Sequence, residues 1–264
     1  MRTLAIGCGG AGANIVSGLD VPNKTIINTD GKSDVTLVPD NIKGTKGDNH
    51  IGMTLAEDNL DAIDGIIEGY DNLIIVAGLG GGTGTGIAPL VAGKASSAGI
   101  RTVAIVTIPM KFEGRDEKTY QALFELIGSA DRIILLDLDI IVSSSKTDTF
   151  ENALIYVDDL MRETIQKIYK MLQGPFFSIF SENMYTISKA EGNTPEEKVR
   201  NALENPLYEI KEHYGKIVIQ ADEGMLRHRD RISEETCLIT GTMPEIIPFK
   251  KEGTTFFIPV SLPN

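Results

Sequence analysis

The chain has 264 residues, of which 25 are basic and 37 acidic, and these give a net charge of −12 and a pI near 4.8. This balance excludes a general binder of nucleic-acid backbones, because such a protein needs a basic face. It still allows a compact site that holds one anionic ligand on backbone N–H groups. Apolar residues make up 42% and charged residues 23%, as in ordinary globular domains.

Cysteine and histidine usage argues against disulfide and metal chemistry. Cys8 and Cys237 lie far apart and form neither a disulfide framework nor a zinc motif. The three histidines lack the spacing of metal ligands, so the sequence predicts no metal site. We find no apolar window long enough to span a membrane and no signal peptide at the first residues. These features favour a cytoplasmic protein without a direct membrane segment.

The first part of the chain alternates apolar runs with amphipathic stretches. The runs predict strands at 4–6, 25–28, 73–77, 102–107 and 132–137. Helical periodicity follows the first of these runs and recurs at 53–68, 87–98 and 116–129. Because the strands are continuously apolar, this alternation predicts an α/β fold with a parallel sheet covered on both faces. Ligands of such sheets bind at the carboxyl ends of the strands.

The second part of the chain has a different pattern. Residues 147–172 predict one long amphipathic helix that ends at Gly174 and Pro175. Beyond it, a helix at 194–205 and strands at 216–220, 236–242 and 254–260 predict a small α+β domain. The sequence therefore predicts an α/β domain that carries the binding loops at 1–146, a central helix at 147–174 and a reduced α+β domain at 175–264.

Two glycine-rich segments follow predicted strands. Residues 7–12 match G-x-G-x-x-G, and Asp30 supplies the acidic residue that a Rossmann site places on ribose. This loop alone indicates nucleotide binding, NAD-type sites included. Residues 78–86 are more specific, because glycine occupies six of the nine positions. Each extra glycine loses additional backbone entropy when the chain folds. Binding of a polyphosphate would explain this cost, because glycines let backbone N–H groups wrap closely around it. No lysine follows these glycines, so the segment is not a Walker P-loop.

The second segment also resembles a known loop. Its GGGTGTG at 80–86 is similar to the signature loop of the tubulin/FtsZ family. Four other segments resemble motifs of this family in the same order: GCGGAGAN at 7–14, NTD at 28–30, FEG at 112–114 and YVDDLMR at 156–162. The resemblance is close over 1–172 and loose over 181–264. It implies a tubulin/FtsZ-like fold whose ligand is GTP or GDP, accompanied by Mg²⁺, in place of NAD.

The resemblance further implies which residues contact the nucleotide. Glu113 is expected at the ribose, and Asn14 and Asp158 at the guanine. The family also places an arginine on the nucleotide, but that position holds Glu117 here, so we expect the nearby Arg115 to reach the phosphates instead. Asp137 stands where the family has a nucleotide-contacting asparagine, and Leu154 where it has a phenylalanine stacked on the base. The remaining phosphate contacts are expected from Gly9, Gly10, Ala11, Gly80, Gly81, Gly82, Thr83 and Gly84.

The sequence departs from the family after the central helix. There the family carries an N-x-D-x-x-D loop that completes the nucleotide site of the next subunit. This chain has no aspartate between Asp159 and Asp222, and Glu182 is the one acid near that position. A solvated surface glutamate is a more common role for such a residue than catalysis. We therefore predict impaired GTP hydrolysis and assign no confident catalytic residue.

The leading hypothesis is thus a guanine-nucleotide-dependent switch or assembling subunit. Its partners would be guanine nucleotide and, in a homo-oligomer or filament, further copies of the chain. The γ-phosphate would be distinguished by residues 80–84 and the loop at 44–52. Two alternatives stay open. One is an active self-assembling GTPase that uses another acid such as Glu182, and the other is an NAD-type oxidoreductase built on residues 7–12 and Asp30.

Overall fold

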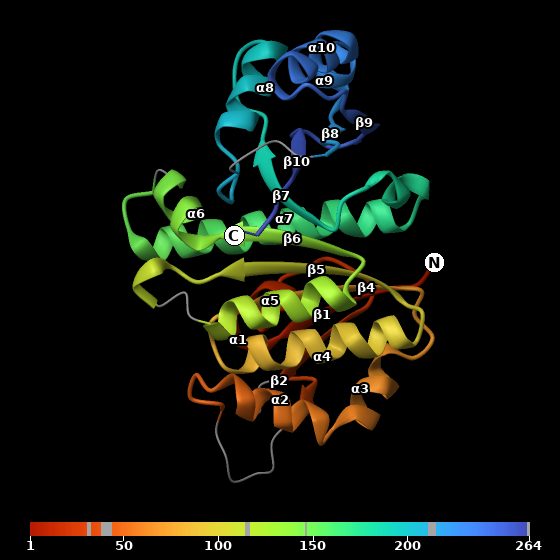
Figure 1. Cartoon of the computed structure of the whole chain (residues 1–264), viewed down its shortest axis with the longest axis vertical. Helices are drawn as coiled ribbons and strands as arrows, with labels where there is room; N and C mark the ends of the chain where they lie inside the picture. The colour runs from red at the N-terminus through yellow and green to blue at the C-terminus, as the bar shows by residue number, and fades with distance from the viewer. Residues whose placement is uncertain (31–32, 38–43, 114–116, 146, 211–214, 263–264) are drawn as a thin grey trace. The chain divides into compact units, whose positions relative to one another are not determined.

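The computed structural model describes residues 1–262 except 31–32, 38–43, 114–116, 146 and 211–214 (Figure 1). The chain forms two compact units. The first consists of Met1–Ile133 and Asp137–Pro175, and the second of Ile134–Leu136 and Phe176–Asn264. Each unit has its own sheet strands and its own helices.

The first unit is built on a parallel sheet with the strand order β3-β2-β1-β4-β5. Its strands are β1 (Thr3–Cys8), β2 (Lys24–Asn28), β3 (Val35–Thr36), β4 (Asn72–Gly78) and β5 (Arg101–Ile108). Strands β1, β4 and β5 are buried over almost their whole length, as a strand covered on both faces must be. The predicted α/β class with a parallel sheet is confirmed.

Seven helices belong to the described part of this unit. They are α1 (Gly9–Ser17), α2 (Asn49–Glu57), α3 (Leu60–Ile67), α4 (Thr83–Ser97), α5 (Glu117–Ser129), α6 (Leu138–Ser144) and α7 (Phe150–Leu172). Helix α4 packs against α2 and α5 (Figure 1). Helix α1 packs against α7. A short 3₁₀ turn, η1 (Lys111–Glu113), follows β5.

The single helix predicted at 53–68 is wrong, because this segment contains parts of two helices. Helix α2 ends at Glu57, and Asn59 has φ −121° and ψ 27° before α3 begins. The Asn59 side chain donates a hydrogen bond to the Leu55 carbonyl at 2.7 Å. Asparagine and aspartate side chains compete in this way for backbone groups, which favours helix ends over helix interiors. The sequence prediction followed the apolar period and missed this interruption.

The second unit is a mixed sheet with the strand order β6-β7-β10-β8-β9. Its strands are β6 (Arg132–Asp137), of which Ile134–Leu136 cluster here, β7 (Met184–Lys189), β8 (Val218–Ala221), β9 (Glu245–Pro248) and β10 (Thr255–Pro259). Strand β10 runs antiparallel to both β7 and β8. The turn η2 (Pro175–Ile179) and the helices α8 (Pro195–Glu204), α9 (Glu223–Leu226) and α10 (Arg229–Thr240) complete the described elements.

The strand predicted at 236–242 is wrong, because most of this segment is the last part of α10. Ile232 and Thr236 are fully buried at helical spacing, while Leu238 is 79% exposed. Gly241 then ends the helix with φ +74°, a left-handed conformation that glycine adopts without strain. The apolar, β-branched composition suggested a strand, but packing of Ile232 into the core under α8 and α10 selects the helix.

The sheet register of the first unit brings its loops to one edge. Cys8 lies opposite Ala77, and Gly78 lies opposite Thr107. The strands are parallel, so β1, β4 and β5 all end at the same side. Both glycine-rich segments therefore leave the sheet as neighbours.

Candidate functional site

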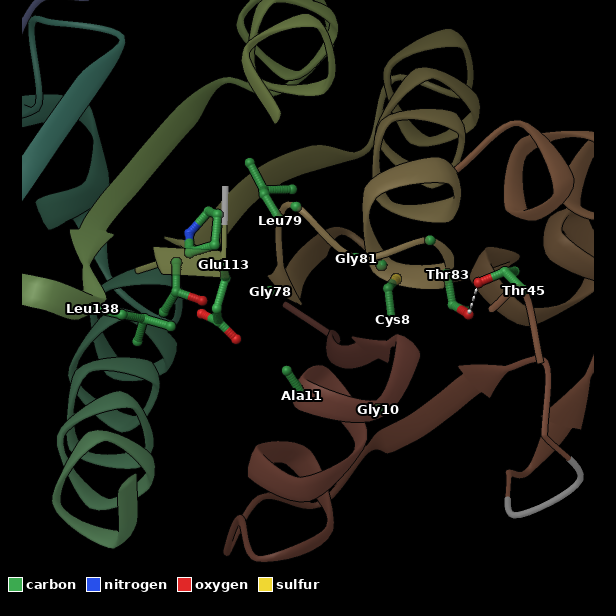
Figure 2. Close-up of a pocket in the computed structure, with 15 residues that line it drawn as sticks. Cys8, Gly10, Ala11, Thr45, Gly78, Leu79, Gly81, Thr83, Glu113 and Leu138 are labelled. Atoms are coloured by element: carbon green, nitrogen blue, oxygen red, sulfur yellow. Dashed lines mark hydrogen bonds between the residues drawn. The ribbon is translucent and has the colours of Figure 1, made fainter. Parts of the chain in front are cut away.

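A cavity of about 450 Å³ lies at this carboxyl edge of the sheet (Figure 2). Its volume is within the range of small-molecule binding sites. Figure 2 shows Glu113 and Leu138 on one side of the cavity and Thr83 and Thr45 on the other. Eight residues expected at the nucleotide line it: Gly10, Ala11, Gly80, Gly81, Gly82, Thr83, Gly84 and Glu113.

Some glycines of this site are required by close packing within the protein. Gly9 has φ +72°, and a Cβ there would lie 2.6 Å from the backbone nitrogen of Gly84. Gly80 has φ +91°, and its Cβ would lie 2.6 Å from the ring of Pro109. The two glycine segments thus touch backbone to backbone, which side chains larger than hydrogen would prevent.

Two other glycines have no such packing reason. A Cβ at Gly10 or at Gly81 would meet no described atom within 4 Å. Both residues are exposed and line the cavity. The space that their missing side chains leave therefore belongs to the cavity, and it allows a ligand to reach the backbone directly.

Two helices begin at the cavity wall with N–H donors at their first turns. Helix α1 starts after Cys8 and α4 starts after Gly82, and within the described residues neither of these capping positions makes a side-chain cap. By contrast, Asp48 caps α2 through its side chain. The first N–H groups of a helix have no intrahelical partner, and the helix dipole adds partial positive charge there. Two such ends at one cavity form a site suited to an anion.

A cluster of three threonine hydroxyls lies at one end of this cavity. The Thr83 hydroxyl is 2.8 Å from that of Thr29 and 3.3 Å from that of Thr45. The three residues come from the start of α4, the end of β2 and the segment before α2. The cluster therefore connects the second glycine segment with the chain that leads into α2.

Hydrogen bonds fix two acidic groups near the cavity, and burial keeps a nearby thiol neutral. The Glu113 carboxylate accepts a hydrogen bond from the Met110 N–H at 3.0 Å, which fixes it on the turn η1. Asp137 is buried and caps α6 by accepting from the Asp139 N–H at 2.9 Å. Burial raises the pKa of the Cys8 thiol to about 12, so this group is neutral near pH 7.

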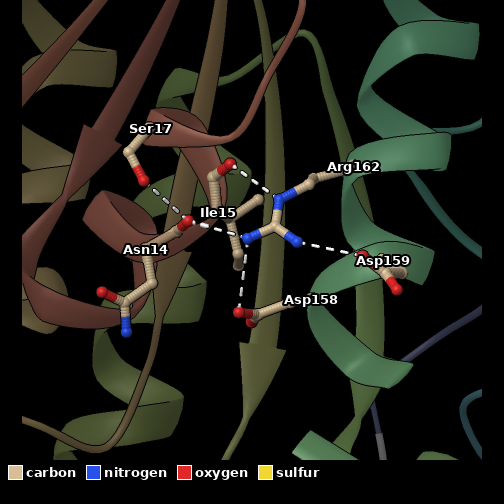
Figure 3. Close-up of polar contacts among 6 residues, drawn as sticks. All are labelled: Asn14, Ile15, Ser17, Asp158, Asp159 and Arg162. Atoms are coloured by element: carbon tan, nitrogen blue, oxygen red, sulfur yellow. Dashed lines mark hydrogen bonds and ion pairs between the residues drawn. The ribbon is translucent and has the colours of Figure 1, made fainter. Parts of the chain in front are cut away.

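The residues expected at the base form a separate cluster around Arg162 (Figure 3). The Asn14 carbonyl accepts from the Arg162 Nη2 at 3.0 Å, and the Asp158 carboxylate lies 3.5 Å from the same nitrogen. Burial raises the pKa of Asp158, whereas the charge of Arg162 opposes that increase and Asp159 adds to it. These side chains do not line the cavity of Figure 2, but Asn14 and the cavity wall belong to the same short helix α1.

Two expected site residues, Asp137 and Glu182, do not line the cavity. A third, Arg115, is outside the described residues. Asp137 serves as a helix cap beside the cavity residue Leu138. Glu182 belongs to the second unit, where its carboxylate accepts from the Ser181 hydroxyl at 3.1 Å.

The sequence reasoning missed several cavity residues. Thr107 lies in the last residues of β5, Pro109 directly follows that strand, and Leu138 directly follows β6. The rule that ligands bind at the carboxyl ends of parallel strands would have found all three. Thr45 is part of the loop expected at 44–52, although residues 49–52 of that loop are the first turn of α2.

Comparison with known proteins shows which family this chain resembles. The model of the tubulin/FtsZ family GTPase domain matches residues 39–146. The chain is 35% identical to the cell division protein FtsZ of Aquifex aeolicus over 188 residues, which cover 64% of this chain and 51% of that protein. It is 28% identical to the FtsZ of Methanothermobacter thermautotrophicus over 239 residues, which cover 79% of this chain and 63% of that protein. Together these matches support a member of the tubulin/FtsZ superfamily.

Solved structures of the superfamily share its fold. An empty FtsZ dimer of M. jannaschii gives a TM-score of 0.78 with 21% identity, covering 98% of this chain and 88% of that one. The CetZ2 protofilament of Haloferax volcanii with GTPγS gives 0.76 with 18% identity, covering 98% and 92%.

The chain spans between about half and just under two thirds of these two FtsZ relatives in sequence. Membership of the tubulin/FtsZ superfamily does not favour the Rossmann oxidoreductase alternative that residues 7–12 and Asp30 left open. Among the described residues, no helix combines the length and the apolar character that a membrane crossing requires.

Proposed function

We propose that this tubulin/FtsZ superfamily member binds GTP and GDP and acts as a nucleotide-dependent switch or assembling subunit with impaired hydrolysis. One observation carries the proposal: two uncapped helix N-termini and two glycines with open space surround one cavity. Backbone N–H groups can hold a polyphosphate in a chain whose net charge is −12. Because guanine nucleotides are supplied in the cytoplasm, the proposal also assigns the protein to that compartment.

Different residues of the cavity would contact different parts of the nucleotide. Gly10, Gly81 and the starts of α1 and α4 would hold the phosphates, and Glu113 would accept hydrogen bonds from ribose hydroxyls. Mg²⁺ would accompany the phosphates, and threonine hydroxyls are oxygen ligands of the kind this ion accepts.

The threonine cluster offers a means of distinguishing GTP from GDP. Thr83 contacts both Thr29 and Thr45, and Thr45 lies just before α2. A further phosphate at these hydroxyls would replace some of their mutual hydrogen bonds and alter the segment at 44–52. Ordering of a segment by the γ-phosphate is a common way to couple nucleotide state to partner binding.

Impaired hydrolysis rests on the segment after α7. This segment leads through η2 into β7 and contains no aspartate in 160–221. Its acid Glu182 is engaged by the Ser181 hydroxyl, and its N–H donates to the Tyr185 hydroxyl at 3.0 Å. These contacts are structural ones within the second unit, which supports a role for Glu182 outside catalysis.

Association with further copies of the chain is the second part of the proposal. Among the structural relatives, one FtsZ was solved as a dimer and one CetZ2 as a protofilament with GTPγS. A switch of this superfamily would use the nucleotide state to decide whether such contacts form.

The first test is to identify the nucleotide that copurifies and to follow phosphate release from GTP at several protein concentrations. The proposal expects bound guanine nucleotide and a low release rate per subunit that does not change with concentration. A rate per subunit that rises with concentration would show that subunits complete each other's sites, and it would reject impaired hydrolysis. Absence of guanine nucleotide binding would reject the proposed function as a whole.

A Glu182→Ala variant distinguishes the proposed function from the alternative of an active GTPase that uses Glu182. If Glu182 were the catalytic acid of an active GTPase, its loss would lower turnover by about a hundredfold or more. We expect the variant to release phosphate at the wild-type rate. Circular dichroism and GDP affinity serve as controls for its folding.

A further inference from the structure

The last turn of α1 lacks a cation of its own. The final four carbonyls of a helix have no intrahelical partner, and the helix dipole leaves partial negative charge there. Helix α1 carries no basic residue in its last turn. Because its first turn lines the cavity, the stability of this short helix bears directly on the phosphate site.

Two cations from other elements supply the missing contacts. Lys24, at the start of β2, donates from its Nζ to the Ser17 carbonyl at 2.8 Å and the Leu19 carbonyl at 2.7 Å. Arg162, on α7, donates from its Nη2 to the Asn14 carbonyl at 3.0 Å and from its Nε to the Ile15 carbonyl at 3.4 Å. Arg162 therefore caps α1 from a distance of almost 150 residues in sequence.

Arg162 also contacts two acidic side chains of its own helix. Its Nη2 lies 3.5 Å from the Asp158 carboxylate, and its Nη1 donates to Asp159 at 3.0 Å (Figure 3). The Arg162 side chain is only 27% exposed, which limits screening of these interactions by solvent. The planar Arg162 guanidinium thus connects α1, whose first turn is expected at the phosphates, with the Asp158 carboxylate, which is expected at the base.

The chain also makes room for this guanidinium. A Cβ at Gly18 would lie 2.6 Å from the Arg162 Nε and 3.0 Å from its Cζ. Gly18 has φ −83°, a conformation that alanine adopts easily, so its backbone does not require glycine. The position of Arg162 explains why a side chain is absent there.

We propose that Arg162 is a positioning residue for guanine recognition, which caps α1 and fixes Asp158 relative to it. This inference rests on the proposed function. An ionised carboxylate accepts hydrogen bonds from the N1–H and the 2-amino group of guanine, whereas inosine lacks that amino group. Correct placement of Asp158 therefore favours GDP over inosine diphosphate, and a misplaced Asp158 loses this preference.

The test measures the affinities of GDP and inosine diphosphate for wild type, Arg162→Ala and Lys24→Met. In Arg162→Ala we expect GDP affinity to fall about tenfold and the preference for GDP over inosine diphosphate to fall at least about threefold. Lys24→Met is the matched control, because it removes a cap of the same helix without touching Asp158. It should lower thermal stability and leave the preference unchanged.

A second variant moves the guanidinium without removing it. Gly18→Ala should displace Arg162 and reproduce the loss of preference, and the double variant with Arg162→Ala should add little to either single change. This variant also tests the inference if Arg162→Ala does not fold.

The possible outcomes distinguish a failure of the proposed nucleotide binding from a failure of the role proposed for Arg162. If wild type does not bind GDP, the proposed function fails and this inference fails with it. If wild type binds GDP but Gly18→Ala and Arg162→Ala keep the wild-type preference, the inference alone is overturned, because a purely structural cap would weaken both nucleotides equally.

Discussion

Packing among the described residues does not require a glycine at position 81. Its φ is not left-handed, and a Cβ there would meet no described atom within 4 Å. We expect Gly81→Ala to keep the wild-type free energy of unfolding without ligand, while its methyl group lowers GDP affinity by about tenfold, or 1.4 kcal/mol. Isothermal titration and urea unfolding measure the two quantities.

Gly128 provides the matched control for that variant. It lies exposed on α5, away from the cavity, and its Cβ position is also open. Gly128→Ala should leave GDP affinity unchanged and stabilise the helix by about 0.5–1 kcal/mol. Equal GDP affinity in the two variants would contradict a ligand at Gly81.

Cys8 lines the cavity but should not react as a thiolate. Burial raises its pKa to about 12, and its residue is fully buried, whereas Cys237 is partly exposed. The thiolate is the reactive form, so at pH 8 a thiol reagent should modify one cysteine in the folded protein and two in urea. Mass spectrometry identifies the modified residue. Rapid labelling of Cys8 in the folded protein would show that β1 does not bury it.

Helix α10 is an element whose two faces can be tested separately. Ile232 is fully buried in the core under α8 and α10, while Leu238 is 79% exposed. We expect Ile232→Ala to lower the free energy of unfolding by about 2–5 kcal/mol. Leu238→Glu should change it by less than about 0.5 kcal/mol. A large loss in Leu238→Glu would instead support the strand that the sequence predicted at 236–242.

The start of α9 is held by a single carboxylate. Asp222 accepts from the Met225 N–H, the Gly253 N–H and the Thr254 hydroxyl. Burial raises its pKa, but these three hydrogen bonds and the charge of Lys198 together lower it by more, so the net change is downward. Its contribution to stability is therefore complete above the unfolded pKa of about 3.9 and is lost as the pH falls through the lower folded value.

Asp222→Ala tests this assignment. It should lower the free energy of unfolding by about 1–2 kcal/mol at pH 5–7, as loss of a helix cap does. The difference from wild type should shrink below about pH 4, because the unfolded carboxylate takes up a proton there and the folded one, with its lowered pKa, follows only at lower pH. Urea unfolding at each pH measures it. A difference that stays constant down to pH 3 would show that the charge of Asp222 does not contribute.

For the whole molecule, nucleotide binding should protect a defined part of the chain. GDP at a hundred times its Kd should raise the free energy of unfolding by about 2.7 kcal/mol. In hydrogen exchange, the protection should concentrate at residues 9–12 and 83–86, where α1 and α4 begin. Amides of β8 and β10 serve as the internal reference and should change little. Protection spread evenly over both units would argue against this cavity as the binding site.

The sequence by itself determined the parallel sheet and the place of both glycine segments, because each of these features is encoded in a short stretch of chain. Continuous apolar runs predict buried parallel strands, and a cluster of six glycines after one of them predicts a loop that approaches a ligand. Short-range patterns also identified the long helix that the structure shows as α7. The motifs within these stretches were sufficient to indicate the tubulin/FtsZ superfamily.

Only the tertiary structure decided features that depend on contacts between distant segments. Residues 236–240 are helical because Ile232 and Thr236 pack into a core, although their local composition favours a strand. Arg162 reaches the end of α1 across 148 positions, and no local pattern encodes which carbonyls it will meet. Likewise, the sequence does not distinguish Gly9, which packing requires, from Gly81, which leaves open space. Such distinctions depend on what surrounds each residue in space, and the folded chain alone brings those neighbours together.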